Sequence, residues 1–475
     1  MGGSIKTVIL LFIALGNASF GFSQSVFNVA FDESNTANHT ANALEVGDSY
    51  FFVQKTYKNN AVQLEGVELD NSGIVVKKQI VVFHPSLNIF YGYPGSLQYL
   101  TSNEFCQLYH IGPDSGINVV FFDSNLAVTR DKRYDFGYFL NAGVVKQVND
   151  STLLVLGRIK NSTTYDLFLI NTDLQGNERW RTIFGDSGKN DYGYAIEMVN
   201  NKIVVGAQTY QNSSVSNPHL FILNNTGNPV FDTTYFGYNN GGYLAYHPNY
   251  GLYLSASRNL SGGGIRPSII RLNANFTIDW AKEYFRDKDF VYLGPHVISD
   301  NGTITTAGSN WENGLAEGLF FQSNHLGDSL GSKLIEHIPG ERAQFDDIRP
   351  TSDGGYILAG ETHIPGQDSW IVKVNAWGCD NIPCIVSVNE PEISIGELNC
   401  YPNPINGAGT ISGSLSSLNG ESKIRVFNSI GQLIQTISIT QKDFEVQVNL
   451  TRNGLYLVNL YQGTELVRSR KWVVR

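Results

Sequence analysis

The chain has 475 residues, which is enough for two or three domains at a typical domain length of about 150 residues. Its 27 Phe, 24 Tyr and 48 Gly, with only 2 Met and 16% charged residues, favour strands and turns over helices. The formal net charge is −10. Because a nucleic-acid backbone is held by clustered Lys and Arg, and the main basic run is Arg468–Lys471, we expect no nucleic-acid partner.

The N-terminus has the pattern of a secretory signal peptide. Lys6 precedes an apolar run from Val8 to Leu15, and small residues follow up to a predicted cleavage point near Ser23 or Gln24. The run is too short to span a bilayer. We therefore predict a signal peptide over residues 1–23 and no transmembrane segment after its removal. The alternative is that the run forms a buried first strand.

A repeat with a period close to 51 residues occupies residues 24–384. Each copy contains an apolar strand that ends in Asn or Asp, and Gly usually follows three residues later, although Leu126 and Phe276 replace it in two copies. Such positions suit hairpin turns, which need positive φ or a side chain that binds its own backbone, so we interpret them as structural. The marker residues are Asp70, Asp123, Asp173, Asn224, Asn273, Asn324 and Asn375.

The clearest copy is Ser352–Gly378, in which strand patterns around Tyr356–Ala359 and Trp370–Val374 are joined by a short polar loop. Further strand patterns precede and follow this pair in most copies, so each unit has four short strands. Seven such units predict an all-β fold, a seven-bladed β-propeller. A solenoid is the alternative, and it would need capping repeats at both ends.

The last copy lacks a matching outer strand after Asn375. Residues Ser25–Asp32, at the start of the predicted mature chain, have the pattern of such a strand. We predict that this segment pairs with the strand around Trp370–Val374, so that the two ends of the domain close one blade.

The four cysteines are Cys106, Cys379, Cys384 and Cys400, and they allow three full pairings. In an exported chain, the short loop between Cys379 and Cys384 favours a disulfide. A metal site is the alternative, but no CxxC pair or paired His accompanies these residues, so we predict no metal. Cys106 lies in an apolar strand pattern and is interpreted as a core residue.

Residues 385–397 contain Pro391 and several acids, and they predict a linker. Over residues 398–475, short alternating strands are separated by turn signals. This pattern predicts a second domain, a small immunoglobulin-like β-sandwich.

Four groups of residues in this second domain match a known family. They are the run of Tyr401, Pro402, Asn403 and Pro404, then Ile424–Phe427 followed by Gly431, then Asn453–Tyr456 with its Gly454 and Tyr456, and finally Lys471–Val474, which begins with Lys471. With them, the segment resembles the type A C-terminal sorting domain of proteins exported by the type IX secretion system of Bacteroidetes. The repeats resemble, more loosely, extracellular propellers that often precede this domain.

The resemblance implies recognition by the type IX translocon and its sorting peptidase. It also implies that the protein is secreted or held at the outer-membrane cell surface, after Sec-dependent export to the periplasm. Cys400 stands where the family usually has an aliphatic residue. The alternative is an ordinary immunoglobulin-like module that stays on the protein.

No familiar catalytic motif is present in the sequence. It has no GxSxG elbow with convincing partners, no HExxH helix, no phosphate loop and no dinucleotide fingerprint. Glu341, Asp346 and Asp347 lie together in the loop expected to enter the last repeat, but glycoside hydrolysis needs two carboxylates at a set separation and nothing indicates a partner. We predict no catalytic residue and no cofactor.

Tyr192, Tyr194, Tyr243 and Tyr292 stand in segments expected to be loops that enter the first strands of successive repeats. Tyr combines apolar area with a hydroxyl, which suits contact with a glycan or a protein. Our leading hypothesis is a non-catalytic propeller that binds such a ligand. The alternatives are packing between blades, a structural surface-layer component, or an exported polysaccharide hydrolase or lyase with carboxylates at the axis. Two facing carboxylates there would favour the enzyme, and an aromatic rim would favour binding.

Overall fold

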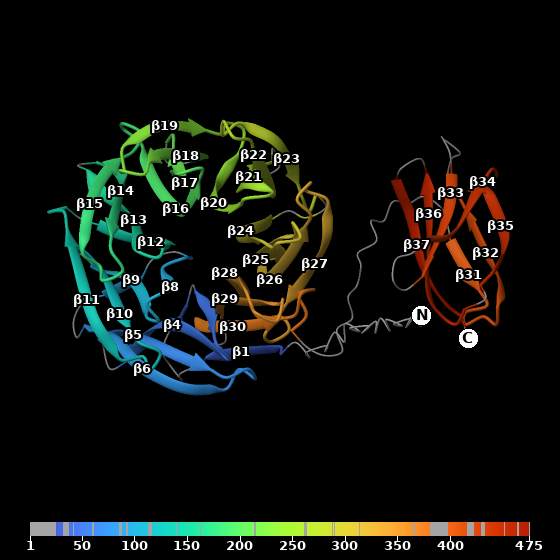
Figure 1. The fold of residues 1–475 in the computed structure, drawn as a ribbon, viewed down its shortest axis with the longest axis horizontal. Coiled ribbons are helices and arrows are strands. Elements are labelled where there is room, and N and C mark those ends of the chain that lie inside the picture. The colour runs from blue at the N-terminus through green and yellow to red at the C-terminus, as the bar shows by residue number, and fades with distance from the viewer. Residues whose placement is uncertain are drawn as a thin grey trace, which may run out of the picture. The chain divides into compact units, whose positions relative to one another are not determined.

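The computed structural model in Figure 1 divides the chain into two compact units, Met1–Val386 and Ser387–Arg475. The predicted signal peptide and linker lie outside the described residues. The structure describes residues 25–31, 38–40, 42–58, 61–84, 88–91, 94–112, 116–138, 140–161, 163–212, 215–260, 264–286, 288, 290–312, 314–363, 366–380, 398–415, 422–428, 433–450, 452–462 and 465–474.

All regular elements of these described ranges are β-strands, and none of their residues forms a helix long and apolar enough to cross a bilayer. The first sheets of the first unit contain β2 (Asn38–His39), β3 (Ala43–Val46), β4 (Ser49–Lys58), β5 (Ala61–Leu69) and β6 (Val75–His84), then β7 (Asn88–Tyr91), β8 (Leu97–Tyr99), β9 (Phe105–Gly112), β10 (Gly116–Phe122) and β11 (Val128–Asp135), then β12 (Leu140–Asn149), β13 (Thr152–Asn161), β14 (Thr164–Thr172) and β15 (Glu178–Phe184).

The remaining sheets of this unit follow the same order. They contain β16 (Asn190–Val199), β17 (Lys202–Tyr210), β18 (Ser216–Asn224) and β19 (Pro229–Thr234), then β20 (Asn239–His247), β21 (Gly251–Asn259), β22 (Ile265–Leu272), β23 (Ile278–Glu283), β24 (Phe290–Ile298), β25 (Ile304–Glu312), β26 (Leu315–Ser323) and β27 (Ser329–Ile335), and last β28 (Ala343–Pro350), β29 (Tyr356–Thr362), β30 (Asp368–Val374) and β1 (Phe27–Phe31).

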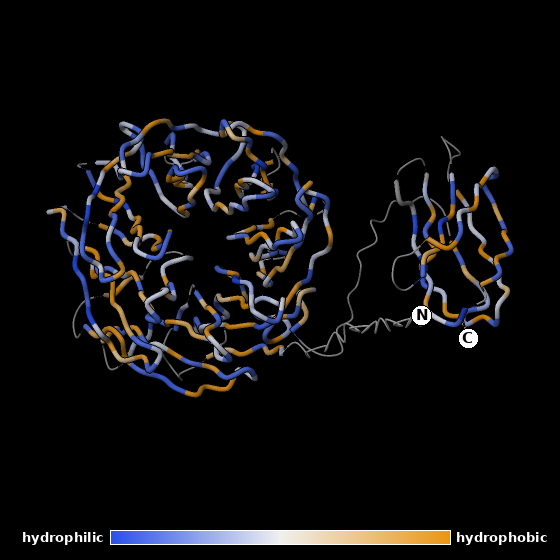
Figure 2. The backbone as a smooth tube through the Cα atoms, viewed as in Figure 1, coloured by the Kyte–Doolittle hydropathy of each residue, from blue (hydrophilic) through white to orange (hydrophobic). Residues whose placement is uncertain are grey.

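The sheets follow one another around a central axis, with strands such as β16, β20, β24 and β28 innermost and β15, β19 and β27 outermost (Figure 1). This arrangement is a β-propeller. The middle strands carry long apolar stretches (Figure 2), and their side chains form cores between neighbouring sheets. The predicted propeller architecture is therefore confirmed.

The turn residues that mark the repeat do what the sequence indicates. Asp70 Oδ1 accepts hydrogen bonds from the backbone N–H groups of Ser72 and Ile74, each at 2.9 Å. The same side-chain oxygen accepts the N–H groups two and four residues later at Asp123, Asp173, Asn224, Asn273, Asn324 and Asn375. Their interpretation as structural residues is confirmed.

The two residues that replace the turn glycine keep its backbone conformation. Leu126 has φ 61° and Phe276 has φ 60°, which costs roughly 1–3 kcal/mol for a residue with a Cβ. Both side chains are buried, at 1% and 6% exposure, in cores between neighbouring sheets. Burial of the apolar side chain, worth about 1.5–3 kcal/mol, offsets the backbone strain.

The N-terminal strand closes the ring. β1 pairs antiparallel with β30, from Phe27 opposite Lys373 to Phe31 opposite Ser369, so the predicted pairing is confirmed. Phe27 is 6% exposed and its ring lies 5.4 Å from that of Tyr50 on β4. β1 therefore completes the last sheet and also fills the core between the last sheet and the first.

The cysteines are in the expected places where they are described. Cys106 is buried with a free thiol, which confirms its interpretation as a core residue. Cys379 is disulfide-bonded, whereas Cys400 is free. Because Cys384 lies outside the described residues, its pairing with Cys379 stays a prediction.

The second unit is a small β-sandwich. One sheet has the order β31-β32-β35 and the other β34-β33-β36-β37, with a shared core that includes Ile411, Ile424 and Trp472. Its strands are β31 (Leu398–Tyr401), β32 (Ala408–Ser414), β33 (Ser422–Asn428), β34 (Leu433–Ile439), β35 (Asp443–Asn449), β36 (Gly454–Gln462) and β37 (Glu465–Val474).

We predict that a chain starting at Asn35, which lacks β1, unfolds at a lower temperature than the mature protein. The loss combines the cross-strand pairs of β1 with the burial of Phe27 and amounts to roughly a few kcal/mol. Thermal unfolding followed by circular dichroism measures it. An unchanged midpoint would show that the ring does not depend on this strand.

A pair of matched substitutions separates packing from chain length. Phe27→Ala removes a buried ring and should cost about 3 kcal/mol. Phe83→Ala alters the outer strand β6, where the ring is 56% exposed, and should change the free energy of unfolding by less than about 1 kcal/mol.

Candidate functional site

The innermost strands share an irregularity at the same level of the ring. The pairing register of β12, β16, β20, β24 and β28 shifts at Ala142/Val144, Gly193/Ala195, Gly241/Leu244, Leu293/His296 and Phe345/Asp347. These are β-bulges, which leave residues unpaired and redirect their side chains. The residues skipped by the pairing are Gly143, Tyr194, Gly242, Tyr243, Gly294, Pro295 and Asp346.

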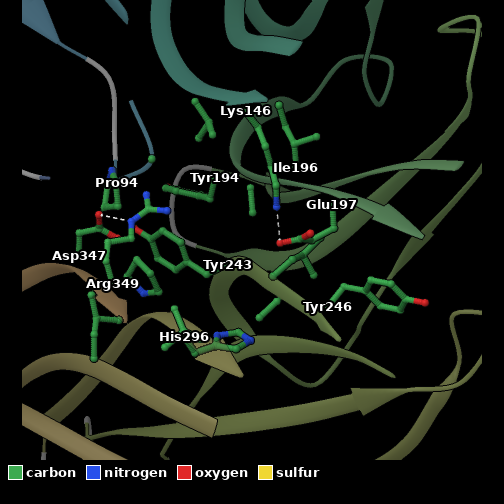
Figure 3. Close-up of a pocket in the computed structure, with 18 of the residues that line it drawn as sticks. Pro94, Lys146, Tyr194, Ile196, Glu197, Tyr243, Tyr246, His296, Asp347 and Arg349 are labelled. Carbon is green, nitrogen blue, oxygen red and sulfur yellow. Dashed lines mark hydrogen bonds and ion pairs between the residues drawn. The ribbon is translucent and has the colours of Figure 1, made fainter. Parts of the chain in front are cut away.

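A cavity of about 330 Å³ lies along the axis and is lined by these strands (Figure 3). It begins at the bulges, since Tyr194, Tyr243 and Pro295 line it, and it continues along the strands to Ile298 and Pro350. Residues at the bulges, which recur in neighbouring blades, thus form part of the wall of the central cavity.

The charged groups of this cavity are paired with each other. Lys146 Nζ on β12 lies 2.7 Å from Glu197 Oε1 on β16, and Arg349 Nε lies 2.9 Å from Asp347 Oδ2 on β28 (Figure 3). Burial raises the pKa of Asp347, and the Arg349 guanidinium opposes that rise. Each carboxylate that lines the cavity therefore has its own cation.

His296 contributes a neutral imidazole to the cavity wall. Burial lowers its pKa to about 4, which the backbone carbonyl of Tyr253 opposes. Nε2 lies 3.2 Å from that carbonyl oxygen and must donate to it, so Nδ1 is a hydrogen-bond acceptor. Among the residues that the structure describes, Nδ1 has no hydrogen-bond partner.

Three of the four predicted tyrosines come together at the axis. The rings of Tyr194 and Tyr243 lie 5.2 Å apart, and the hydroxyl groups of Tyr243 and Tyr292 are hydrogen-bonded to each other. The Tyr292 side chain is 39% exposed. Tyr192 lies apart from them, against the rings of Tyr165 and Tyr210.

The prediction that these tyrosines stand in loops is wrong, because all four lie within strands. Tyr192 and Tyr194 belong to β16, Tyr243 to β20 and Tyr292 to β24. Each inner strand begins several residues before its apolar stretch. Polar residues are tolerated in that first part because the edge of the strand faces the axis. Asp346 and Asp347 are likewise on β28 and not in the loop that leads to it.

A charged cluster adjoins the bulge of β28. Glu361 on β29 lies 3.2 Å from His39 Nε2 on β2 and 3.3 Å from His363 Nε2, and it accepts a hydrogen bond from Gln344 at 3.1 Å. Asp346 Oδ2 lies 3.7 Å from His39 Nε2. Within the described ranges no three His, Cys, Asp or Glu side chains are arranged to hold a metal ion.

The protonation states of this cluster follow from its contacts. Burial alone would lower the pKa of His39, but hydrogen bonds and the charges of Asp346 and Glu361 raise it to about 9. Burial would raise the pKa of Glu361, but His39 in particular lowers it to about 2. His39 is therefore an imidazolium paired with a carboxylate at neutral pH.

In the second unit, the two ends of the predicted sorting motif meet. Asn403 Nδ2 donates to the Lys471 carbonyl at 3.0 Å, and the Val473 N–H donates to Asn403 Oδ1 at 2.9 Å. Trp472 Nε1 donates to the Pro402 carbonyl at 2.8 Å. The loop of Tyr401, Pro402, Asn403 and Pro404 thus fixes the last strand, which starts far away in sequence.

The other residues of this motif have structural contacts where they are described. Gly454 opens β36, and Tyr456, which is 6% exposed, donates its hydroxyl hydrogen to the Arg452 carbonyl at 2.9 Å. Gly431 lies outside the described residues. The motif therefore builds the sandwich that the secretion machinery would recognise.

Comparison with known proteins identifies the second unit. Residues 399–475 match the family model described as a secretion system C-terminal sorting domain. The chain thus carries a sorting domain of the type IX secretion system and is secreted to the cell surface or the extracellular medium. No curated protein matches the chain.

Several solved structures resemble the chain at low identity. A prolyl endopeptidase matches with 10% identity and a TM-score of 0.46 over 80% of this chain, which spans about half (53%) of that protein. An oligogalacturonate lyase in complex with manganese matches with 8% identity and a TM-score of 0.46, over 74% of this chain and 96% of that one. The Neurospora crassa Pan2 WD40 domain matches with 11% identity and a TM-score of 0.44, over 70% and 88%. Likenesses of this size carry no activity to this chain.

The His39–Glu361 pair predicts a pH dependence of stability. Because the pKa of His39 rises from 6.5 to about 9 on folding, its contribution is complete below pH 6.5 and is lost as the pH rises to about 9. Urea unfolding from pH 6 to 9.5 should show a decrease on the order of 1–2 kcal/mol, less than the full shift because the side chain is partly open to solvent.

His39→Asn provides the matched comparison, since it removes the titrating group and keeps a polar side chain. The decrease between pH 6.5 and 9 should be absent from this variant. An equal decrease in both proteins would mean that another group is responsible.

Proposed function

We propose that this secreted propeller binds a glycan or a protein at the axial end of its inner strands and catalyses no reaction. The observation that carries the proposal is the group of Tyr194, Tyr243 and Tyr292 beside the bulges, two of which line the central cavity. Tyrosine rings offer apolar area with a hydroxyl, and they bind with little loss of conformational freedom.

The electrostatics of the cavity support binding over hydrolysis. An exported polysaccharide hydrolase or lyase would need an acid and a base or nucleophile at a set separation. Glu197 and Asp347 are each engaged by a cation, Lys146 and Arg349. A carboxylate neutralised in this way is a poor acceptor for a substrate proton, so we favour the binding function.

We further propose that the ring has seven blades. The strands β20–β27 form one sheet, but β22 and β24 are joined by a single parallel residue pair, Ile265 with Phe290. Divided at this point, the sheet gives two sets, β20–β23 and β24–β27, and each has the four-strand order of the neighbouring sheets. A crystal structure of the mature chain counts the blades, and six or eight would contradict this assignment.

The export route follows from both ends of the chain. The sorting domain implies contact with the type IX machinery, and we propose that residues 1–23 direct the preceding Sec-dependent step. The propeller, over residues 24–384, is then the cargo, joined by the linker 385–397 to the sorting domain at 398–475. N-terminal sequencing of periplasmic material tests the cleavage after residue 23.

A glycan array probed with the mature protein tests the binding function. Tyr194→Ala and Tyr292→Ala should each weaken binding of the best ligand by about ten-fold, because each removes a ring and a hydroxyl at the site. Tyr138→Ala is the control, since that side chain is 57% exposed and lies outside the inner strands. Binding that survives both site variants unchanged would place the ligand elsewhere.

A further inference from the structure

Two cations of the propeller, Lys55, which is buried, and Arg158, which is partly buried, have no carboxylate beside them in the described part of the chain. Lys55 on β4 is only 9% exposed, and Nε and Nη1 of Arg158 on β13 are buried without a hydrogen-bond partner. Within the described part of the chain, neither side chain forms an ion pair. Burying even part of an unpaired charge is unfavourable, so such an arrangement points to an anion that completes it.

The two cations occupy equivalent places in the ring, on either side of His110. Lys55, His110 and Arg158 each lie on the second strand of a sheet, opposite an inner-strand residue: His39, Phe90 and Asn141 respectively. They come from three successive sheets, so they form one row across neighbouring blades.

The charges of Lys55 and Arg158 both influence His110, which lies between them in this row. Burial and, to a smaller extent, the positive charges of Arg158 and Lys55 together lower its pKa to about 4. His110 is therefore neutral, with Nδ1 accepting a hydrogen bond from the Ala142 N–H at 3.1 Å. It separates the two cations and does not compensate their charge.

Aromatic rings surround both cations. Lys55 Nζ lies 4.8 Å from the ring centres of Tyr57 and Phe90, and Arg158 Cζ lies 4.3 Å from that of Tyr192 and 5.1 Å from that of Tyr165. A cation–π contact contributes about 0.5–2 kcal/mol, which falls short of the desolvation cost. Tyr57 and Phe90 are each 40% exposed, so part of their ring surface is open to a ligand.

We propose that Lys55 and Arg158, with the rings beside them, bind an anionic saccharide through carboxylates of the uronic-acid type. The carboxylates would pair with these two cations, and the sugar rings would lie on the exposed aromatic surface. This inference rests on the proposed binding function and names the chemical class of its ligand. A nucleic-acid backbone is held by clustered Lys and Arg, whereas this row supplies two separate cations, Lys55 and Arg158.

The test is isothermal titration calorimetry of the full mature chain at low salt, with tetragalacturonate as the probe. Its fully methyl-esterified form is the neutral counterpart, and a thymidine dodecanucleotide is the competing polyanion. The acid should bind at least about ten-fold more tightly than the ester, and more weakly as salt is added. Equal binding of acid and ester, no binding of the acid, or tighter binding of the oligonucleotide would overturn the proposal.

Substitutions assign the binding to these residues. Lys55→Met and Arg158→Met should each weaken binding of tetragalacturonate by about ten-fold or more without lowering the thermal midpoint, because an uncompensated charge is removed. Arg258→Met is the matched control, since Arg258 also lies over a tyrosine ring, that of Tyr238 at 5.3 Å, but pairs with Glu283 at 2.8 Å.

The variants also separate this inference from the proposed function. If Arg158→Met binds tetragalacturonate as the parent does while Tyr194→Ala loses binding, the anionic site is wrong and the axial function stands. If Arg258→Met loses as much affinity as Arg158→Met, the effect is a general one of surface charge and the proposal fails.

Discussion

The closed ring of the propeller depends on a partner strand that covers the edge of β30. A strand with an unpaired edge exposes a row of N–H and C=O groups, and a ring of sheets removes that edge only if a partner strand is supplied from elsewhere. Here the partner is β1, from the opposite end of the unit. Because Phe27 of β1 also packs against Tyr50, the same strand holds the last sheet against the first.

That closure positions the candidate site. Strands from several sheets surround the axis only while the ring stays closed, and each contributes one bulge at a common level. The side chains that the bulges redirect include Tyr194, Tyr243 and Asp346. The blades thus share a backbone pattern but carry different residues at their bulges, which is how a repeat can build an asymmetric binding surface.

Sequence reasoning succeeded where the cause is local. Asn or Asp at the turns binds its own backbone two and four residues later, so the repeat and its hairpins could be predicted from composition and spacing. Because the other copies have four strand patterns, the absence of the fourth from the last copy also indicated that residues 25–32 supply it. The same reasoning singled out Tyr194, Tyr243 and Tyr292, which the fold brings together, and their role in binding stays a prediction.

It failed where the cause lies between repeats. Bulges leave no clear pattern in sequence, so Asp346 and the tyrosines were assigned to loops. Lys55 and Arg158 are about 100 residues apart in the chain, and only the ring places them on either side of His110. In the second unit, Asn403 contacts Lys471 and Val473. The sequence shows the order of these two motif groups but does not show that they touch.

Hydrogen–deuterium exchange of the mature chain, with and without a bound glycan from the array, shows where on the propeller the ligand binds. We expect protection on binding to be concentrated in the inner strands β16, β20, β24 and β28 and in the adjoining ends of β4 and β13. Protection confined to the outer strands, such as β15 and β27, or to the second unit would contradict it.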